Sequence, residues 1–527
     1  MKCLANLVSR ALDAHSTWKV VIATFLWLAA TTWTRPLLLP DEGRYVGVAW
    51  SMLDVGQFSV PRLDGLPFFH KPPLFYWITA LAMQCFGANE WAARLSSVLS
   101  ATLMVGLLFW FLKTYVNQKV AILAALILAS QPFLFGAAQY ANLDMTVAGI
   151  ISATVIAGAV AVFRLERGES YRLILALAYA AAGLGFLAKG LIGIVLPGGI
   201  LFFWLLGRRR FDTMRRLFTW VGAGVFLLVS LPWMLAMQRL YPGFFDYYII
   251  YQHFERFLEK GFNNPYPFWF YIPVLLGLTL PWSLQLWRVF NKTYWSDSAY
   301  GAVRGLMLSW LLVVLIFFSV PSSKLVGYVL PALAPFAFFL AEPFAARLRG
   351  AGAARALTTL TGFLLVSIVI CVAAVTTLIV APQPSSRALA GQMLTSYRPA
   401  DKVVMLNRYS YDLGFYLHTS KSVFVVSGWD NPDLKFQDNW RKELFDAGQF
   451  EPDTAARLLI KPQDLVDKLC ADRVITLWLW GDKNSVADYP FLASISPYAA
   501  DGKSRVWRIQ AGPALSFCAE RPKSGQE

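Results

Sequence analysis

The feature that most constrains the fold is a series of long apolar runs spread over the first 380 residues. A helix needs about 20 apolar residues to cross the hydrocarbon core of a bilayer. Eleven runs of roughly this length occur, at residues 18–39, 90–113, 119–137, 142–163, 172–188, 190–206, 216–238, 267–288, 303–320, 326–346 and 357–380. The sequence therefore predicts a polytopic α-helical membrane protein with about 11–13 transmembrane helices.

The composition supports a membrane protein and argues against nucleic-acid binding. The chain is 57% hydrophobic and only 15% charged, with a mean hydropathy of +0.49. Its formal net charge is +15, but the segment from Pro382 onward holds 18 basic and 17 acidic residues. Almost all of the excess therefore lies in the short loops between apolar runs, where basic residues set the membrane orientation.

The basic loops also predict the orientation. Basic residues mark every second loop: Lys113 and Lys119, Arg164 to Arg172, Arg208 to Arg216, Arg288 and Lys292, and Arg347 to Arg355. These loops are expected to be cytoplasmic, together with the N-terminus, whose first apolar run is expected to be an uncleaved anchor. Loops 40–89 and 239–266 and the C-terminal tail are then periplasmic. The shorter stretch from Leu74 to Phe86 is expected to lie along the membrane surface.

Two domains are predicted: a transmembrane catalytic domain of residues 1–381, covered by loops 40–89 and 239–266, and a periplasmic soluble domain of residues 382–527. In the second domain, β-rich runs alternate with helix-compatible segments, which is typical of a small α/β fold. The β-rich runs are Lys402–Leu406, Ser422–Val426, Arg473–Trp480 and Arg505–Ile509, and the helical segments are Trp440–Ala447 and Lys461–Leu469. Cys470 and Cys518 lie in this domain, and the sequence leaves open whether they form a disulfide.

Ionisable residues gather at the predicted periplasmic face. Charges beside a membrane span are costly and are seldom kept without a partner or a ligand. The predicted topology brings together Asp41, Glu42, Arg44, His70, Lys71, Asp144, Lys189, His253, Arg256, Lys324 and Tyr328. Titratable groups clustered in a partly desolvated cleft indicate an active site, here one that acts on a charged substrate.

Each of these residues also has a purely structural explanation. Asp41 and Glu42 could favour the start of a helix, since carboxylates stabilise the first turn. Asp144 and Lys189 could form a structural ion pair. Lys71 could be a snorkelling interfacial lysine, and Lys324 and Tyr328 could be interfacial anchors. It is the convergence of the whole set on one face that favours a functional site.

Several motifs carry a resemblance to a known family. In chain order they are Asp41-Glu42-Gly43-Arg44-Tyr45, Phe69 to Trp77, Leu143-Asp144, Ala188-Lys189-Gly190, His253 to Phe257, Pro267 to Tyr271, and Ser323 to Tyr328. This set resembles bacterial aminoarabinose lipid A transferases and related polyprenyl-phosphate-dependent glycosyltransferases. These are GT-C fold enzymes, relatives of protein O-mannosyltransferases. The resemblance covers roughly residues 20–345.

The resemblance implies an inverting transfer of a sugar from an undecaprenyl-phosphate donor to lipid A or another envelope lipid or glycan. Asp41 matches the catalytic aspartate, which activates or orients the acceptor, and Asp144 matches a second acid. Lys71 and Tyr328 match residues that hold the donor phosphate, whose growing negative charge a cation and a phenol stabilise. The remaining implied substrate-binding residues are Glu42, Arg44, Tyr45, Lys189, His253, Arg256 and Lys324.

One departure from the family concerns a metal ion. The transferases usually carry a glutamate before the Lys-Pro pair, and here that position is His70. Histidine is a common zinc ligand. A divalent metal such as zinc, held by Asp41, His70 and His253, therefore stays an open alternative to a metal-free site.

Two other functional classes compete with the transferase. A transporter or lipid flippase should hold its ionisable residues near the middle of its spans and show internal symmetry. Here those residues lie at one face, and no repeat is visible. A scaffold without catalysis gives no reason for Asp41 and Lys71 to lie on the same face. The sequence favours the enzyme.

Overall fold

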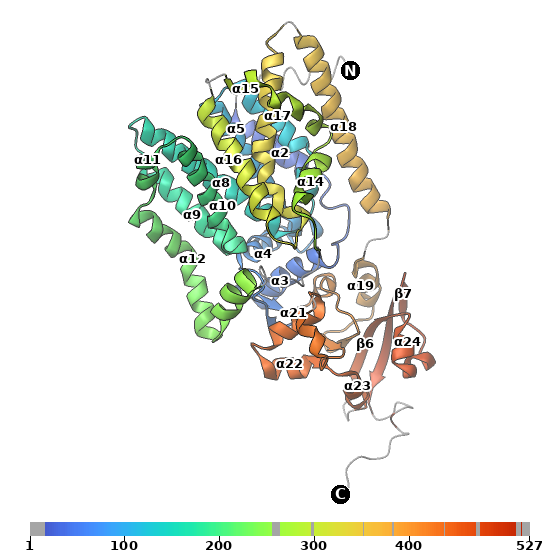
Figure 1. Ribbon diagram of the computed structural model, residues 1–527. Coiled ribbons are helices and arrows are strands. Elements are labelled where there is room, and N and C mark those ends of the chain that lie inside the picture. The colour runs from blue at the N-terminus through green and yellow to red at the C-terminus, as the bar shows by residue number, and fades with distance from the viewer. Residues whose placement is uncertain are drawn as a thin grey trace. The chain divides into compact units, whose positions relative to one another are not determined.

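The computed structural model describes residues 16–255, 264–296, 300–350, 352–381, 384–436, 438–470, 475–512 and 518. The chain forms two compact units (Figure 1). We call them the helical unit, which comprises Met1–Arg35, His70–Ala82 and Asn89–Pro382, and the sheet unit, which comprises Pro36–Phe69, Met83–Ala88 and Gln383–Glu527. The sheet unit thus adds residues 36–69 and 83–88 to the predicted segment 382–527.

Helices of the helical unit occupy most of the predicted apolar runs, but the run 18–39 is helical only over Thr17–Ala29, and its residues 36–39 belong to the sheet unit. Among the described residues, seven helices are long and apolar enough to cross a membrane, or nine if each of two bent helix pairs counts as one span. The seven are α5 (Glu90–Tyr115), α8 (Leu143–Glu166), α9 (Arg172–Lys189), α12 (Trp220–Leu240), α16 (Gly301–Ser319), η4 with α17 (Val326–Arg347) and α18 (Ala353–Val380). Shorter apolar helices are α2 (Thr17–Ala29), α4 (Leu74–Phe86) and α10 (Ile192–Gly207). The predicted polytopic α-helical fold is confirmed.

The two bent pairs each break at a proline. α6 (Gln118–Ser130) and α7 (Pro132–Ala138) meet at 62°, and Pro132 forces the preceding residue out of helical geometry. In the second pair, η2 and α14 (Phe268–Leu278) and η3 (Trp282–Phe290) meet at 117°, with Pro281 at the break. The run at 267–288 is therefore folded back sharply and is not one straight helix.

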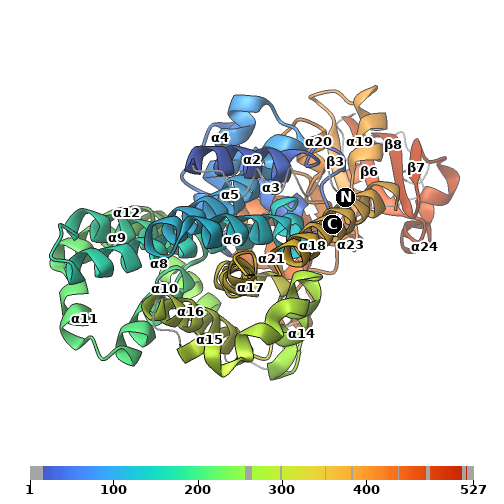
Figure 2. The same cartoon turned by 90° about the horizontal axis from the view of Figure 1, so that it is seen from above.

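Small residues let the helices of this unit pack closely. α8 packs against both α5 and α9, and α9 also packs against α10 and α12 (Figures 1 and 2). At the α5–α8 contact, a Cβ added to Gly149 would lie 2.7 Å from the carbonyl oxygen of Ser100. Such contacts replace the hydrophobic effect, which does not drive helix association inside lipid.

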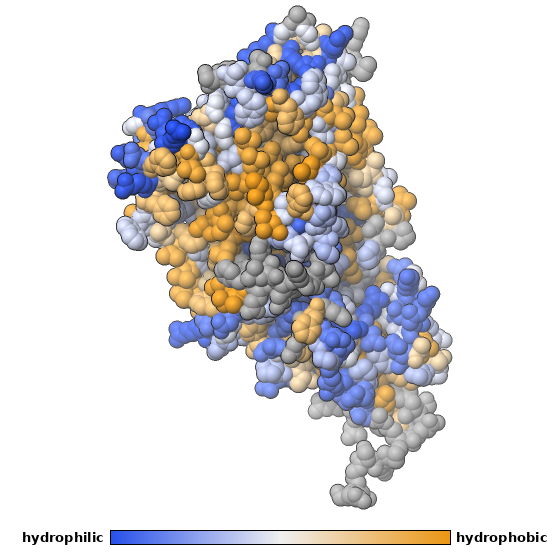
Figure 3. Space-filling model, viewed as in Figure 1, coloured by the Kyte–Doolittle hydropathy of each residue, from blue (hydrophilic) through white to orange (hydrophobic). Residues whose placement is uncertain are grey.

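Apolar side chains also cover much of the outside of the helical unit (Figure 3). Leu228 of α12 is 75% exposed and Ile316 of α16 is 62% exposed. A soluble protein rarely exposes so much contiguous apolar surface, whereas lipid tails solvate it well. The surface therefore fits a bilayer environment.

The remaining short helices of the helical unit connect the longer ones. They are α11 (Phe211–Leu217), the π-helix η1 (Asp246–Glu255) and α15 (Lys292–Ser296).

The sheet unit is built on a six-stranded mixed sheet in the order β5-β4-β3-β6-β8-β7. The strands are β3 (Lys402–Leu406), β4 (Phe424–Val426), β5 (Leu459–Ile460), β6 (Ile475–Asp482), β7 (Ala499–Asp501) and β8 (Ser504–Ala511). β3 pairs in parallel with β4 and β6, while β8 is antiparallel to both β6 and β7. The predicted C-terminal α/β domain is confirmed as a fold.

Both faces of this sheet are buried, which explains why its central strands are apolar runs. On β6, Leu477 and Leu479 join one apolar cluster, and the alternating Trp478 and Trp480 join the other. Successive side chains of a strand point to opposite faces. The helices of this unit include α19 (Arg387–Leu394), α20 (Leu413–Tyr416), α21 (Trp440–Gly448), α22 (Pro452–Leu458), α23 (Pro462–Leu469) and α24 (Ser485–Asp488).

Residues 36–69 of the sheet unit form a helix and a hairpin. α3 (Asp41–Val55) contacts α20 and is followed by β1 (Arg62–Leu63) and β2 (Leu66–Pro67). Arg62 forms an ion pair with Glu451, and Asp64 Oδ1 accepts a hydrogen bond of 2.7 Å from the Val423 backbone N–H.

Cys470 and Cys518 form a disulfide that closes a loop of 48 residues, which resolves the alternative left open above. We expect the double substitution Cys470→Ser/Cys518→Ser to lower the free energy of unfolding by about 2–5 kcal/mol, because the unfolded chain regains loop entropy. Thermal unfolding of the full chain measures this effect. Cys85→Ser is the control, since Cys85 is an exposed free thiol. Equal midpoints for the double variant and the control would contradict the prediction.

Candidate functional site

The candidate site residues fall into two clusters, one in each unit. The first, which we call the Arg44 network, lies in the sheet unit and consists of Asp41, Arg44, Tyr411 and Glu443. The Arg44 guanidinium forms ion pairs with both Asp41 and Glu443. Glu443 also accepts a hydrogen bond of 2.7 Å from the Tyr411 hydroxyl.

The start of α3 explains why two acids precede the arginine. Asp41 and Glu42 occupy the first turn, where carboxylates interact favourably with the helix dipole. Glu42 is fully buried, and its Oε2 accepts a hydrogen bond of 2.9 Å from the Leu38 N–H. The Asp41 side chain is instead 40% exposed. Of the two acids, Asp41 is therefore the one that solvent or a substrate can reach.

The ring of Tyr45 is buried, and the Arg44 guanidinium lies 5.0 Å from its centroid. Tyr45 therefore supports the arginine from the next position of the same helix. Its predicted role in substrate binding remains a prediction.

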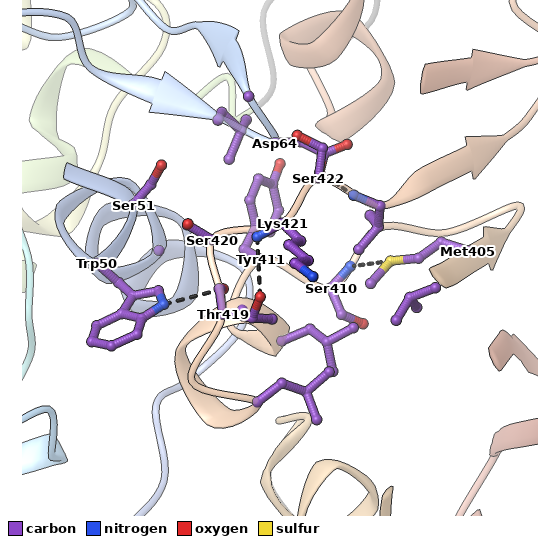
Figure 4. Close-up of a pocket in the computed structure, with 18 of the residues that line it drawn as sticks. Trp50, Ser51, Asp64, Met405, Ser410, Tyr411, Thr419, Ser420, Lys421 and Ser422 are labelled. Carbon is purple, nitrogen blue, oxygen red and sulfur yellow. Dashed lines mark hydrogen bonds between the residues drawn. The ribbon is translucent and has the colours of Figure 1, made fainter. Parts of the chain in front are cut away.

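A small cavity lies beside this network (Figure 4). Trp50, Asp64, Ser410, Tyr411 and Thr419 contribute to its lining. Burial raises the pKa of Asp64 to about 7, although the Val423 N–H opposes this shift. The cavity has a volume of about 60 Å³, well below the roughly 300–1,000 Å³ of pockets that bind small-molecule ligands. It is too small to be a sugar site.

The second cluster, which we call the Asp144 cluster, lies in the helical unit and consists of Asp144, Lys189 and Tyr328. Asp144 stands in the first turn of α8 behind the N-cap Asn142, whose side chain accepts a hydrogen bond of 2.8 Å from the Asp144 N–H. Its carboxylate forms an ion pair with Lys189, the last residue of α9. The Lys189 ammonium lies 4.2 Å from the centre of the Tyr328 ring.

The backbone of Gly327, next to Tyr328, lies very close to the Asp144 side chain. A Cβ added to Gly327 would lie 2.5 Å from Asp144 Oδ2, so only glycine allows this close approach. The side chains of Asp144 and Lys189 are each 11% exposed. A cation, an acid and a phenol thus meet in a largely desolvated place, where charge interactions are strong.

Lys324 is held by the backbone. It is buried, and its ammonium donates hydrogen bonds to the carbonyl oxygens of Tyr266, at 3.0 Å, and Pro321. The same two segments also form a β-bridge between Pro265 and Ser323. In the structure, Lys324 therefore joins segments 264–266 and 321–324. Its role as a ligand for a substrate stays a prediction.

His70 and Lys71 precede α4 in the helical unit. His70 is buried, with its ring 5.9 Å from that of Tyr247, and Lys71 is half-buried. Pro72 and Pro73 follow, and prolines are tolerated at a helix start because no N–H is needed there.

The predicted metal set of Asp41, His70 and His253 stays a prediction. His253 lies within η1, but its side chain falls outside the described residues, as does Arg256 entirely. Within the part of the chain that the structure describes, no group of three or more His, Cys, Asp or Glu side chains is placed to hold a metal ion.

Two members of the Arg44 network were missed by the sequence analysis. Tyr411 and Glu443 lie about 370 and 400 residues after Arg44, in a segment with no catalytic motif. No sequence signal marks them. Lys442, Glu443 and Asp446 are all buried in α21 despite their charges, and only the fold reveals that burial.

Family and sequence comparisons identify proteins that are similar to this chain. The profile of the dolichyl-phosphate-mannose-protein mannosyltransferase family matches residues 70–235. An undecaprenyl phosphate-alpha-4-amino-4-deoxy-L-arabinose arabinosyl transferase of Sodalis glossinidius is 35% identical over 62% of this chain and 58% of its own length. A second, from Erwinia tasmaniensis, is 31% identical over 58% of this chain and 55% of its own length. The chain thus spans less than two thirds of these relatives.

A solved structure extends the likeness to nearly the whole chain. ArnT from Cupriavidus metallidurans, crystallised with undecaprenyl phosphate, superposes with a TM-score of 0.78 at 21% sequence identity, over 94% of this chain and 98% of that protein. This match confirms the predicted GT-C fold together with its C-terminal domain. The resemblance to aminoarabinose transferases, stated from the motifs, is confirmed as well.

Proposed function

We propose that this chain is a membrane glycosyltransferase of the aminoarabinose lipid A type. It transfers 4-amino-4-deoxy-L-arabinose from undecaprenyl phosphate to lipid A, at the periplasmic face of the inner membrane. The relatives' names support this sugar and this lipid carrier, and the structural neighbour binds undecaprenyl phosphate. The Cys470–Cys518 disulfide supports the periplasmic placement, since disulfides persist in oxidising compartments.

The observation that carries the proposal is the state of Asp41. One carboxylate oxygen is held by Arg44, while the side chain remains 40% exposed. A group that activates or orients an acceptor must be both fixed and reachable. In the transfer, an acceptor oxygen attacks the anomeric carbon from the face opposite the phosphate, and the bond from that carbon to the phosphate oxygen breaks. The configuration inverts, and undecaprenyl phosphate leaves with the bonding electrons.

The cations and the phenol of the helical unit are suited to that leaving group. Negative charge grows on the phosphate oxygen as the bond breaks, and fixed donors stabilise it most in a desolvated place. We assign this role to Lys71 and Tyr328, with Lys189 and Asp144 as their support. We also assign Arg44 to the acceptor side, with the buried Glu42 and Tyr45 as its support, and His253, Arg256 and Lys324 to donor binding.

The competing transporter function is less consistent with the positions of the charged residues. Asp144 lies in the first turn of α8 and Lys189 is the last residue of α9. A proton relay or an ion site in a transporter is expected near the middle of the spans. The pair at two helix ends favours a reaction at a membrane face.

Mass spectrometry of envelope glycolipids tests the proposed function. Cells that express the chain should contain lipid A that carries aminoarabinose, and cells with Asp41→Asn in the same chain should not. An unchanged lipid A profile in both strains, with the protein present in the membrane, would contradict the proposal.

Lys71→Ala should mainly weaken binding of the donor. A hydrogen bond to a charged group contributes about 1.5–3 kcal/mol, so we expect the Kd for undecaprenyl phosphate to rise about 10- to 100-fold. Binding to the detergent-solubilised full chain measures it. Lys113→Ala is the control, because Lys113 is an exposed lysine in the last turn of α5. A Kd that stays equal to that of the control would remove Lys71 from the phosphate site.

A further inference from the structure

The Arg44 network joins residue 41 to residues more than 360 positions away. Glu443, in α21, is buried, and its side chain is only 4% exposed. Its two oxygens have different partners: Oε1 accepts from Arg44 and Oε2 accepts from the Tyr411 hydroxyl. The opposite side of the Arg44 fork reaches Asp41 Oδ1. The four groups therefore form one chain of hydrogen bonds within the sheet unit.

Side-chain exposure rises along this series of hydrogen bonds, from Glu443 toward Asp41. The side chain of Arg44 is 18% exposed, between the 4% of Glu443 and the 40% of Asp41. Charge-assisted hydrogen bonds hold a guanidinium in a fixed plane, and a planar fork between two carboxylates fixes its direction. The rings of Tyr45 and Tyr411 lie 5.0 Å and 5.9 Å from Arg44. Arg44 is thus anchored at its buried side and presents its other side to Asp41.

The protonation states suit this arrangement. Burial and the neighbouring Glu443 carboxylate raise the pKa of Tyr411 well above its usual value, so its hydroxyl stays a donor. Burial alone would lower the pKa of Arg44. The charge of Glu443, together with Tyr45, Tyr411 and Asp41, outweighs burial and raises the pKa well above its usual value, so the guanidinium stays charged.

We propose that Glu443 and Tyr411 are positioning residues for the reaction. They fix Arg44, and through Arg44 they fix the carboxylate of Asp41 in the orientation that the acceptor needs. The inference rests on the proposed function, in which Asp41 acts on the acceptor. It gives the C-terminal segment a specific role in catalysis, although that segment carries no catalytic motif of its own.

A second ion pair in the same unit provides a matched control. Arg62, from the β1–β2 hairpin, pairs with Glu451 at 2.8 Å. Like Arg44 and Glu443, these residues join segment 36–69 to the C-terminal segment, but neither contacts Asp41. If the Arg44 network only held the two segments together, neutralising Glu443 or Glu451 should change the rate of sugar transfer by the same amount.

The first experiment compares Glu443→Gln with Glu451→Gln in the full-length protein. Sugar transfer is measured with the undecaprenyl-phosphate-linked aminoarabinose donor and lipid A. Glutamine has the shape of glutamate without its charge and with only one acceptor oxygen, so it can no longer hold both Arg44 and Tyr411 by charge-assisted hydrogen bonds. We expect kcat to fall about 100-fold in Glu443→Gln, as for a small misplacement of a reacting group, with the KM for the donor unchanged. Glu451→Gln should keep the wild-type kcat.

The second experiment tests whether Glu443 acts through Arg44. In an Arg44→Gln background, Glu443→Gln should change kcat by less than about twofold, because its partner is already absent. Tyr411→Phe should lower kcat about 10-fold, since one of the two anchors of Glu443 is lost. It removes a single hydroxyl, so it provides a second test if Glu443→Gln lowers the melting temperature.

Three results would overturn the inference. The first is equal kcat values in Glu443→Gln and Glu451→Gln, with Asp41→Asn inactive. The second is a Glu443→Gln effect that persists in full without Arg44. The third is a wild-type rate in Asp41→Asn, which would remove the proposed catalytic role of Asp41 and the positioning inference with it. The first two leave the proposed function intact.

Discussion

Asp41→Asn should nearly abolish sugar transfer while the protein still folds and binds undecaprenyl phosphate. Asparagine keeps the size of the side chain and one oxygen for the hydrogen bond from Arg44. It cannot accept a proton or carry a negative charge toward the acceptor. Positioned acid–base catalysis contributes about 10²–10⁴-fold, and we expect kcat to fall by that factor.

The measurement is transfer from the lipid-linked donor to lipid A by purified protein, with donor binding measured on the same preparation. Asp54→Asn is the matched control, because Asp54 lies on the same helix and its side chain accepts a hydrogen bond of 2.8 Å from the Ser420 N–H. Turnover of Asp41→Asn equal to that control would refute the catalytic assignment. Lost donor binding would instead move Asp41 to the donor site.

Glu342→Leu should cause the largest loss of stability of any single change considered. Arg304 of α16 and Glu342 of α17 are both buried, and two guanidinium nitrogens donate to the Glu342 carboxylate, the shortest bond being 2.7 Å from Nη2. The Tyr294 hydroxyl donates to the same carboxylate. Removing Glu342 deprives the buried Arg304 charge of its carboxylate, and breaking a buried ion pair in this way costs about 3–5 kcal/mol.

Thermal unfolding of the full chain in detergent measures this loss, as a lower melting temperature. The double variant Arg304→Met/Glu342→Leu is the control, since replacing both charges with apolar side chains of similar size is often close to neutral. A Glu342→Leu variant as stable as the double variant would show that Arg304 finds another partner.

The sequence predicted where helices and strands lie better than it predicted how the helices bend and run in space. The run Lys402–Leu406 is β3 with the same limits, because a strand buried on both faces must be apolar throughout. The run 267–288 has the length of a span, yet it bends by 117° near Pro281. Apolar composition predicts burial in lipid and says little about direction, which depends on packing against neighbouring helices.

The sequence pointed to candidate residues where they stand in motifs or at helix ends. The ion pair between Asp144 and Lys189 was weighed from the sequence, since both residues lie near the ends of apolar runs. Glu443 and Tyr411 could not be found in this way. Their contacts with Arg44 depend on how segment 36–69 packs with the C-terminal segment, a long-range pairing that no local pattern encodes.

The central claim is that this chain moves aminoarabinose from undecaprenyl phosphate to lipid A. The most direct test is mass spectrometry of purified full-length protein incubated in lipid vesicles with that donor and lipid A. The account predicts lipid A that gains one aminoarabinose, with release of an equal amount of undecaprenyl phosphate. Unmodified lipid A beside an intact or merely hydrolysed donor would contradict it.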